Sequence, residues 1–385
     1  MAWSPTLMCP KRSPMAISAN ARRGPRLFVI PLLMVLAAGC NTASQPASPH
    51  IPTYATIDIL GAPTNQFMGT RPTAIRNDGT VVGCFTDTGF VSHGFVLSPD
   101  GTLTTVDDPA ALKGYGAGTC ISSINSFGAV AGTYVAVLTI PGLWQGFARG
   151  SDGQFSSPLT SADIPPGAIR ITPTSIDDAG DIAGFYEDNI FSYPFMVSHN
   201  GQLILLPISF QPGFGPPGGG INYLSAEGDA VGTFDPVGPS SGFVRHSDGR
   251  FEFVAAPSNG DPNYAGTDAR CINSSGSIVG AVYSNVSHSF LRAPDGTFTI
   301  FDPPGIAGRS IAMFINASGA IVGNFQDANS GQHGYLRNTD GSFVIIDDPN
   351  ALPSGATSIT GFNDLGQIVG TYSDAQGYGH GFIRQ

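Results

Sequence analysis

Residues 315–349 decide the fold: they read INASGAIVGNF and, after a short spacer, HGYLRNTDGSFVIIDDP. Asn316-Ala317-Ser318-Gly319 places Asn first and Gly fourth, which is typical of a type I turn followed by a bulge. Thr339-Asp340-Gly341 forms a second turn between runs of β-branched and aromatic residues, which favour strands. The segment therefore predicts two successive hairpins, with one strand ending near Ile315 and three more at 320–325, 333–337 and 342–347.

The same segment is copied along the chain. A first-turn glycine with a second glycine four residues later occurs seven times, at spacings of 43 to 52 residues. The first glycines are Gly79, Gly128, Gly180, Gly228, Gly276, Gly319 and Gly366. The second turn recurs in six of the copies. A repeat of this length, built from short strands, indicates radially repeated four-stranded sheets.

The two ends of the repeat region complement one another. The last copy stops after its third strand, at residues 380–384, whereas residues 54–58 resemble a fourth strand with no partners before it. Pairing of these segments would leave no unsatisfied sheet at either end. The sequence therefore predicts an all-β fold, a seven-bladed β-propeller over residues 53–385, whose ring is closed by the N-terminal strand.

Residues 1–39 resemble the signal peptide of a bacterial lipoprotein. Five basic residues and no acidic residue precede a short apolar segment at 27–36, which is too short to span a bilayer. Leu36-Ala37-Ala38-Gly39-Cys40 resembles a lipobox, although Ala37 stands where Leu is usual. We expect a lipid on Cys40 and a flexible tether at residues 40–52, rich in Ser, Ala, Pro and Thr. By the same resemblance, Asn41 favours the outer membrane.

Charge narrows the range of partners. The chain carries 17 basic and 28 acidic residues, and five of the basic ones lie in the leader, so the mature chain would have a net charge of −16. Such a chain is a poor partner for nucleic acid. It also has no polybasic segment for anionic lipid, so we expect membrane contact through the lipid anchor only.

The repeats resemble the extracellular repeats named after a His-Ala-Phe tripeptide, the HAF repeats. The tripeptide appears here at four positions that begin with His93, His288, His333 and His380, together with the Asn-x-x-Gly-x-Ile-Val-Gly element. The resemblance covers residues 54 to 385 and implies an extracytoplasmic protein. It implies no activity that could be assigned to a residue.

These four histidines could hold a metal ion or tie each sheet together internally. Equivalent positions in stacked sheets lie about 10 Å apart, whereas a metal needs its nitrogens about 2 Å from one centre. We therefore predict structural histidines and no metal site. Acidic residues before proline, such as Asp107-Asp108 and Asp347-Asp348, fit turn chemistry better than a cation site.

Two short motifs match catalytic or cofactor patterns only by letter. Residues 238–242 match a nucleophile elbow, and residues 213–218 match a dinucleotide fingerprint. Both patterns require a following helix, and neither segment precedes one in our prediction. We therefore predict no catalytic residue and no cofactor.

Three cysteines would remain after lipid attachment. Cys84 and Cys120 fall on neighbouring strands of consecutive copies and are candidates for a disulfide, which an extracytoplasmic compartment permits. Cys271 is expected to be buried and free. Trp144 and three variable segments, at 135–144, 211–220 and 257–270, are expected in loops.

These observations predict an extracytoplasmic, lipid-anchored propeller that acts as a binding scaffold for an envelope protein or a glycan. Two alternatives stay open: a hydrolase or lyase acting on surface polysaccharide, and a purely structural envelope protein. A converging pair of carboxylates with raised pKa would favour the enzyme.

Overall fold

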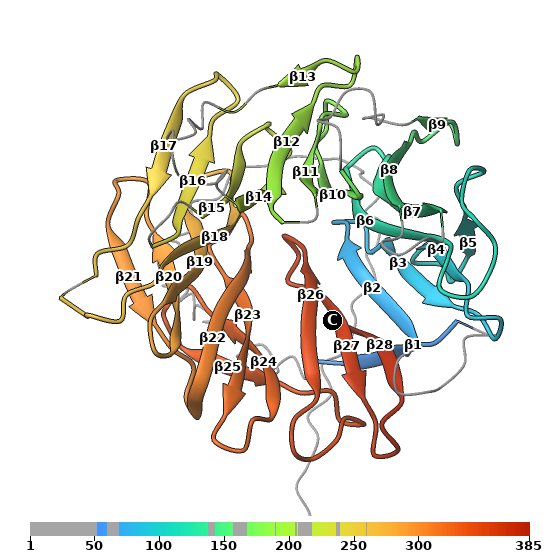
Figure 1. Cartoon of the computed structure of the whole chain (residues 1–385). Coiled ribbons are helices and arrows are strands. Elements are labelled where there is room, and N and C mark those ends of the chain that lie inside the picture. The colour runs from blue at the N-terminus through green and yellow to red at the C-terminus, as the bar shows by residue number, and fades with distance from the viewer. Residues whose placement is uncertain are drawn as a thin grey trace, which may run out of the picture. The chain divides into compact units, whose positions relative to one another are not determined.

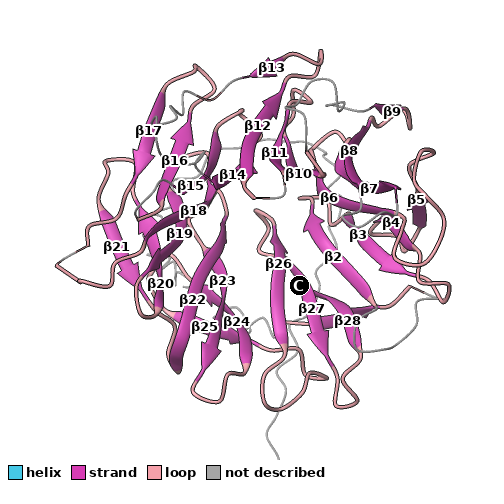
Figure 2. Cartoon of the chain, viewed as in Figure 1, coloured by secondary structure: helices cyan, strands magenta, loops and turns pink. Residues whose placement is uncertain are grey.

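The regular elements are all β-strands. The computed structural model describes residues 52–385 except 60–68, 138–142, 157–167, 189, 205, 207–217, 236–238 and 259. Within these residues 28 strands follow one another, and no helix interrupts them (Figure 1, Figure 2). No helix in this part of the chain has the length and apolar character that crossing a bilayer requires.

Four strands that follow one another form an antiparallel meander, and this unit is repeated. The first three such sheets contain β2 (Thr70–Ile75), β3 (Val81–Thr86), β4 (Ser92–Leu97) and β5 (Leu103–Val106); β6 (Thr119–Ile124), β7 (Val130–Val137), β8 (Leu143–Arg149) and β9 (Phe155–Ser156); and β10 (Arg170–Ile176), β11 (Ile182–Glu187), β12 (Ser192–Val197) and β13 (Leu203–Ile204). The next two contain β14 (Gly218–Leu224), β15 (Ala230–Asp235), β16 (Ser241–Arg245) and β17 (Phe251–Val254); and β18 (Gly266–Ile272), β19 (Ile278–Tyr283), β20 (Ser287–Arg292) and β21 (Phe298–Phe301). The last two contain β22 (Ile306–Ile315), β23 (Ile321–Asp327), β24 (Gln332–Arg337) and β25 (Phe343–Ile346); and β26 (Thr357–Phe362), β27 (Ile368–Ser373), β28 (Gly379–Arg384) and the N-terminal β1 (Tyr54–Ile57).

The sheets lie beside one another, with the first strand of each sheet innermost in the view of Figure 1. Among the described residues, single parallel bridges join five pairs of neighbouring sheets. They are Ser92 with Gly118, Trp144 with Arg170, Ser240 with Gly266, Ser287 with Arg309, and Gln332 with Ala356. The chain therefore forms four-stranded antiparallel units that contact each other mainly through side chains.

The hairpin turns follow from their sequence. Gly319 donates its N–H to Asn316 O at 3.0 Å and has φ of 88°, a conformation that glycine adopts without steric cost. Asn316 also accepts the N–H of Ala320 on its side chain. Gly341 has φ of 86° in the second turn. Because both turns lie at the same end of each meander, we call this the turn end and the opposite end the loop end.

The second glycine of the repeat has a different role, which is close packing. A Cβ on Gly323 would lie 2.2 Å from Ile311 O on the neighbouring strand and 2.6 Å from the ring of Tyr335. The aromatic residue of the repeated tripeptide thus covers a strand position that has no side chain. Five such aromatic side chains are fully buried over their glycines: Phe147, Phe243, Phe290, Tyr335 and Phe382.

The N-terminal strand β1 pairs with the last strand, β28. Tyr54 is opposite Arg384 and Ile57 is opposite Gly381 in an antiparallel register. Thr53 and Gln385 exchange two backbone hydrogen bonds, of 3.1 and 2.9 Å, beyond the end of the strands. The sheet of β26, β27 and β28 therefore obtains its fourth strand from the other end of the chain.

Two kinds of side chain link neighbouring sheets. Turn-starting asparagines donate to a backbone oxygen of the next turn: Asn125 to Asp177 O, Asn273 to Asn316 O and Asn363 to Arg76 O, at 2.8 to 3.0 Å. Three residues before the start of the first turn, a hydroxyl or amide side chain donates to a backbone oxygen on the first strand of the next sheet. These second links are Thr73 to Ile121 O, Thr174 to Ile221 O, Asn222 to Ala269 O and Thr360 to Pro72 O, at 2.7 to 2.9 Å.

The structure corrects three boundaries from the sequence prediction. Trp144 lies in β8 and not in a loop, because β7 continues to Val137 and β8 begins at Leu143. The predicted connection at 211–220 ends earlier, because β14 starts at Gly218. The connection at 257–270 also ends earlier, because β18 starts at Gly266. In each case strand pairing extends a regular element into a segment without the repeat pattern.

Candidate binding site

Each of the four repeat histidines lies within its own sheet and contacts a carboxylate. The Nδ1 atom lies 2.7 to 3.0 Å from an Asp that follows the fourth strand. The pairs are His93 with Asp107, His288 with Asp302, His333 with Asp347, and His380 with Asp58. The last pair joins β28 to the end of β1. Each of the four histidines therefore fastens the outer strand of its own sheet.

A second contact holds the other side of the imidazole. Nε2 of His93 lies 3.5 Å from Asp87, in the connection between β3 and β4, and the ring stacks on Phe85. The backbone N–H of Val91 and the nearby His93 lower the pKa of the Asp87 carboxyl. In the described residues, no three His, Cys, Asp or Glu side chains form a group that could hold a metal ion.

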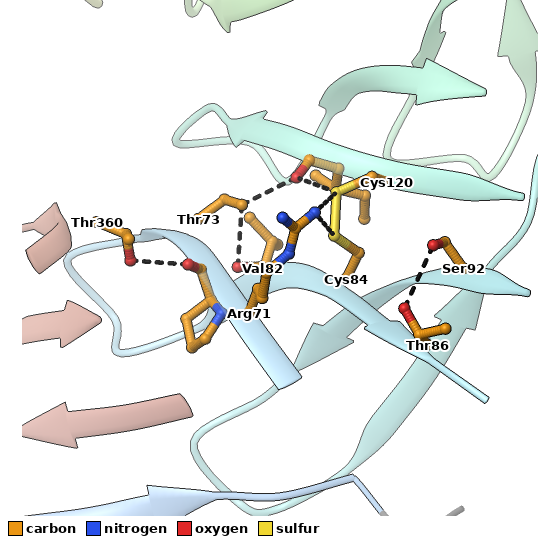
Figure 3. Close-up of a disulfide and its surroundings, with 10 residues drawn as sticks. Arg71, Thr73, Val82, Cys84, Thr86, Ser92, Cys120 and Thr360 are labelled. Carbon is orange, nitrogen blue, oxygen red and sulfur yellow. Dashed lines mark hydrogen bonds between the residues drawn. A yellow bond between two sulfur atoms is a disulfide. The ribbon is translucent and has the colours of Figure 1, made fainter. Parts of the chain in front are cut away.

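A disulfide joins two neighbouring sheets. Cys84 on β3 and Cys120 on β6 are bonded, and Nη2 of Arg71 lies 3.4 Å from Cys84 Sγ and 3.9 Å from Cys120 Sγ (Figure 3). Cys271 is buried and free, and burial raises its thiol pKa to about 12. This thiol stays protonated at neutral pH and is a poor nucleophile. Cys40, the predicted lipid attachment residue, lies outside the described residues.

Hairpins at the turn end surround a cavity of about 340 Å³. Its wall includes Asn125, Asn316 and Asn363, whose amides serve the turns, and the deeper Tyr223 and Cys271. Burial raises the pKa of the Tyr223 hydroxyl far above its ordinary value. The cavity is thus lined largely by groups that hold the fold.

A second concavity, at the loop end, departs most from the repeat pattern. It measures about 610 Å³, and residues of three consecutive sheets, from β11 to β19, line it. We call it the loop-end hollow. Its lining residues are Phe185, Glu187, Ile190, Phe191, Ser192, Gly218, Gly219, Gly220, Asn222, Thr233, Ser240, Asp268, Arg270 and Tyr283.

A buried carboxylate, Asp268, organises the wall of this hollow. Its residue is only 4% exposed. Oδ1 accepts hydrogen bonds from Asn222 Nδ2, at 2.9 Å, and from the Thr233 hydroxyl. Oδ2 accepts from Arg270 Nε and Nη2, at 2.7 and 2.6 Å, and from the Tyr283 hydroxyl at 2.9 Å. A charge with this many partners is stabilised and fixes the orientation of all four donors.

The protonation states of these donors are well defined. Burial disfavours the charged guanidinium, but the charge of Asp268 and its contact with Tyr283 raise the pKa of Arg270 above its ordinary value. Burial, followed by the charge of Asp268, raises the pKa of the Tyr283 hydroxyl. At neutral pH the hollow therefore presents a cationic Arg270 and a neutral Tyr283.

The network occurs at one place because the repeat changes there. The position of Asp268, five residues before the turn, is held in the other copies by Arg71, Cys120, Thr172, Gly220, Ile311 and Ser358. The position of Arg270 is held by a hydroxyl residue in four copies, and three of these hydroxyls form the link to the next sheet. Arg270 instead bonds to Asp268 in its own sheet.

The floor of the hollow is bare backbone. Gly218-Gly219-Gly220 begins β14, and a Cβ on Gly220 would lie 3.2 Å from the ring of Phe185. A side chain at Gly220 would crowd Phe185, and one at Gly219 would meet the backbone of Thr233, so both positions favour glycine.

Beyond the hollow, Arg170 continues the polar surface. Its Nε lies 3.5 Å from Glu187 Oε2, and its guanidinium lies 5.0 Å from the centre of the Trp144 ring. Trp144 therefore belongs to a structured wall beside the hollow, where the sequence predicted a loop contact.

Sequence reasoning missed Asp268, Arg270 and Tyr283. Their spacing matches no catalytic or metal motif, since they converge through strand pairing and not along the chain. A signal was nevertheless present: alignment of the copies shows two charges, at Asp268 and Arg270, in columns that are mostly small or hydroxyl-bearing.

Two buried carboxyls in the described residues have a raised pKa, and both serve turns. Burial raises the pKa of Asp108, which accepts the N–H of Ala110. Burial also raises the pKa of Asp177 to about 6, and this residue accepts the N–H of Asp181 in a first turn. Neither carboxyl lines the loop-end hollow.

No protein-family model matches the chain, and no curated protein matches it. Solved structures do. Virginiamycin B lyase from Staphylococcus aureus is 14% identical, with a TM-score of 0.53, over 87% of this chain and all of that chain. A prolyl endopeptidase is 12% identical with a TM-score of 0.57, over 80% of this chain and 47% of that chain. Prolyl oligopeptidase B from Galerina marginata is 12% identical with a TM-score of 0.51, over 84% of this chain and 47% of that chain.

These similarities define the fold class. The matched proteins contain β-propellers, and the repeated four-stranded antiparallel sheets of this chain have the same architecture. The chain is therefore a β-propeller. At 12–14% identity the likeness shows the fold alone, and the activities of those proteins are not transferred to this chain.

Proposed function

We propose that this chain is an extracytoplasmic binding protein with a seven-bladed propeller closed by β1. The pairing of β1 with β28 supports closure, as do the links from the last sheet to the first, Asn363 to Arg76 O and Thr360 to Pro72 O. A closed ring is rigid and presents its loop end as a fixed surface, which suits recognition.

The observation that carries the binding role is the network around Asp268 in the loop-end hollow. A regular propeller junction requires only a hydroxyl link, as Thr360 provides. Here a buried carboxylate orients an arginine, a tyrosine and an amide beside an open floor. Pre-oriented polar groups in a concavity of a few hundred Å³ are typical of ligand sites.

We further propose that the chain is a lipoprotein of the HAF-repeat type, attached through Cys40 and located in the outer membrane. The disulfide between Cys84 and Cys120 suits an oxidising compartment. Thr53 enters β1 at the turn end, and the twelve residues 41–52 reach at most about 40 Å. A lipid on Cys40 would thus restrain the turn end and leave the hollow accessible.

A fragment screen observed by NMR tests the binding role without assuming a ligand. We expect polar fragments to bind the purified chain and to lose binding in Ser192→Trp, which fills the hollow. Gln332→Trp is the matched control, because Gln332 occupies the equivalent strand position in the β22–β25 sheet. If no fragment binds, or if Ser192→Trp leaves every hit unchanged, the hollow is not a binding site.

Membrane fractionation tests the anchor separately. Cys40→Ser should move the protein from the membrane fraction to the soluble fraction. Unchanged fractionation would refute lipid attachment at Cys40 and would leave the binding role untouched.

A further inference from the structure

We infer that the loop-end hollow recognises the ring of a neutral sugar. This inference rests on the proposed binding role and assigns the ligand class to the same site. It follows from the charge balance, the hydrogen-bonding groups and the aromatic surfaces of the hollow.

The charges of the hollow are already paired within the protein. Asp268 is neutralised by Arg270, at 2.6 Å, and Glu187 is paired with Arg170, at 3.5 Å. An anionic ligand would need an unpaired cation and a cationic ligand an unpaired carboxylate, and the described lining residues include neither. Desolvation of a charged ligand would therefore go uncompensated, whereas a neutral polar ligand avoids this cost.

The remaining polar capacity suits hydroxyl groups. The two N–H groups of Asn222 Nδ2 face three acceptors, Thr233 Oγ1, Asp268 Oδ1 and Ala269 O, and no hydrogen bond among the described residues uses Oδ1 of Asn222. Arg270 keeps 31% of its side chain exposed, and Glu187 likewise keeps 31% exposed. Donors and acceptors thus stand side by side. A sugar hydroxyl both donates and accepts, so neighbouring hydroxyls of one ring can satisfy both kinds.

The aromatic part of the lining suits the apolar face of a sugar ring. Phe185, Phe191 and Tyr283 line the hollow, and the glycines of β14 leave its floor free of side chains. Aromatic faces carry partial negative charge and attract positively polarised C–H groups, which one face of a pyranose presents. The volume of about 610 Å³ lies within the range of roughly 300–1,000 Å³ typical of small-molecule sites.

A double variant tests this assignment with little risk to folding. Asp268→Ser combined with Arg270→Thr introduces the residue types found at Ser358 and Thr360, the equivalent positions of the last sheet. Both charges disappear together, so no buried charge is left unpaired. The Arg270 donor disappears as well, and Asn222, Thr233 and Tyr283 lose the carboxylate that orients them.

The experiment measures binding of methyl glycosides of glucose, galactose, mannose and N-acetylglucosamine, and of their disaccharides, by saturation-transfer NMR and calorimetry. Glucuronate and glucosamine serve as charged counterparts. We expect saturable binding of at least one neutral sugar, and weakening of about tenfold or more in the double variant because charge-assisted hydrogen bonds are lost. Ser192→Trp should abolish binding, and Gln332→Trp should leave it within about twofold of wild type.

Two outcomes would overturn the assignment. One is binding of only glucuronate or glucosamine, and the other is equal affinity of neutral sugars for wild type and the double variant. If fragments bind the hollow but no sugar does, the carbohydrate assignment alone is wrong. If neither fragments nor sugars bind, the proposed binding role also fails.

Discussion

Two junctions between neighbouring sheets show how the same position serves either folding or recognition. Between the last sheet and the first, Thr360 donates a hydrogen bond to Pro72 O. Between the β14–β17 and β18–β21 sheets, Asn222 makes the equivalent bond to Ala269 O but also contacts Asp268. The second junction therefore keeps the structural link and adds an oriented charge beside an open floor.

The difference indicates that a repeat protein can gain a site where one copy departs from the others. The regular junctions need only neutral, short side chains. The irregular junction carries a buried carboxylate, which must keep all its partners to be tolerated. The following predictions test whether regular and irregular junctions respond differently to substitution.

The largest effect is expected at the junction that has a covalent link. Replacing Cys84 and Cys120 together by alanine should lower the free energy of unfolding by about 4 kcal/mol, because the disulfide closes a loop of 36 residues. Urea unfolding measures the change. Cys271→Ala is the control: it removes one buried sulfur without a cross-link and should cost only about 1 kcal/mol. Equal effects would show that the disulfide adds no stability.

At the irregular junction, removal of one partner should be worse than removal of both. Arg270→Thr alone should destabilise by about 3 kcal/mol, because Asp268 would be left buried without its cation. Asp268→Ser combined with Arg270→Thr should stay within about 1 kcal/mol of wild type. A double-mutant cycle by chemical denaturation measures the coupling. If the two substitutions changed the free energy of unfolding additively, Asp268 and Arg270 would not be energetically coupled.

At the regular junction, the turn amide is the sensitive group. Asn363→Ala should destabilise by about 2 kcal/mol, since it removes the bond to Arg76 O and the acceptor for Leu365 and Gln367 N–H. Thermal and urea unfolding report this loss. Asn338→Ala, in an exposed second turn, is the matched control and should cost less than about 1 kcal/mol. An unchanged free energy of unfolding in Asn363→Ala would show that the amide links do not stabilise the fold.

The smallest effect concerns Asp177, which holds the turn-start position that is asparagine in four copies. Burial raises its pKa in the folded protein to about 6, above the ordinary value of 3.8. The stability from this group is present below about pH 4 and is lost as the pH rises through 6. The free energy of unfolding of Asp177→Asn, relative to that of wild type, should therefore increase by on the order of 1 kcal/mol between pH 4.5 and pH 7.5.

Paired unfolding curves of wild type and Asp177→Asn at the two pH values measure this difference and cancel the contributions of other acids. Asp181→Asn is the control for the neighbouring carboxylate, which contributes less than burial to the raised pKa of Asp177. A stability difference that does not change with pH would show that Asp177 titrates normally.

Local chemistry explains why much of the fold was predictable. The turn at Asn316–Gly319 follows from one amide and one glycine. The structure contains the hydrogen bond from Gly319 N–H to Asn316 O and the one from Ala320 N–H to the Asn316 side chain. The pairing of β1 with β28 followed from a strand missing at one end and spare at the other, and the register of Tyr54 with Arg384 bears out that pairing. The turn and strand patterns that recur at spacings of 43 to 52 residues are sufficient to predict these turns and this strand pairing.

The site was less predictable because it depends on contacts between copies. Asp268 and Thr233 are 35 residues apart, and nothing local indicates that they meet. The same holds for His380 and Asp58, which are 322 residues apart. Both residues lie at repeat positions, but their contact follows only from the completed last sheet.

The exchange of strands between the two ends has a consequence for biosynthesis. Because β1 is made first and β28 last, the pair cannot form until the whole domain has been synthesised. A chain in transit through a membrane would hold an unpaired Tyr54–Ile57 segment throughout, so its final cooperative step would come after release. Since Thr53 and Gln385 are hydrogen-bonded neighbours, a circular permutant opened at another connection should bypass that delay.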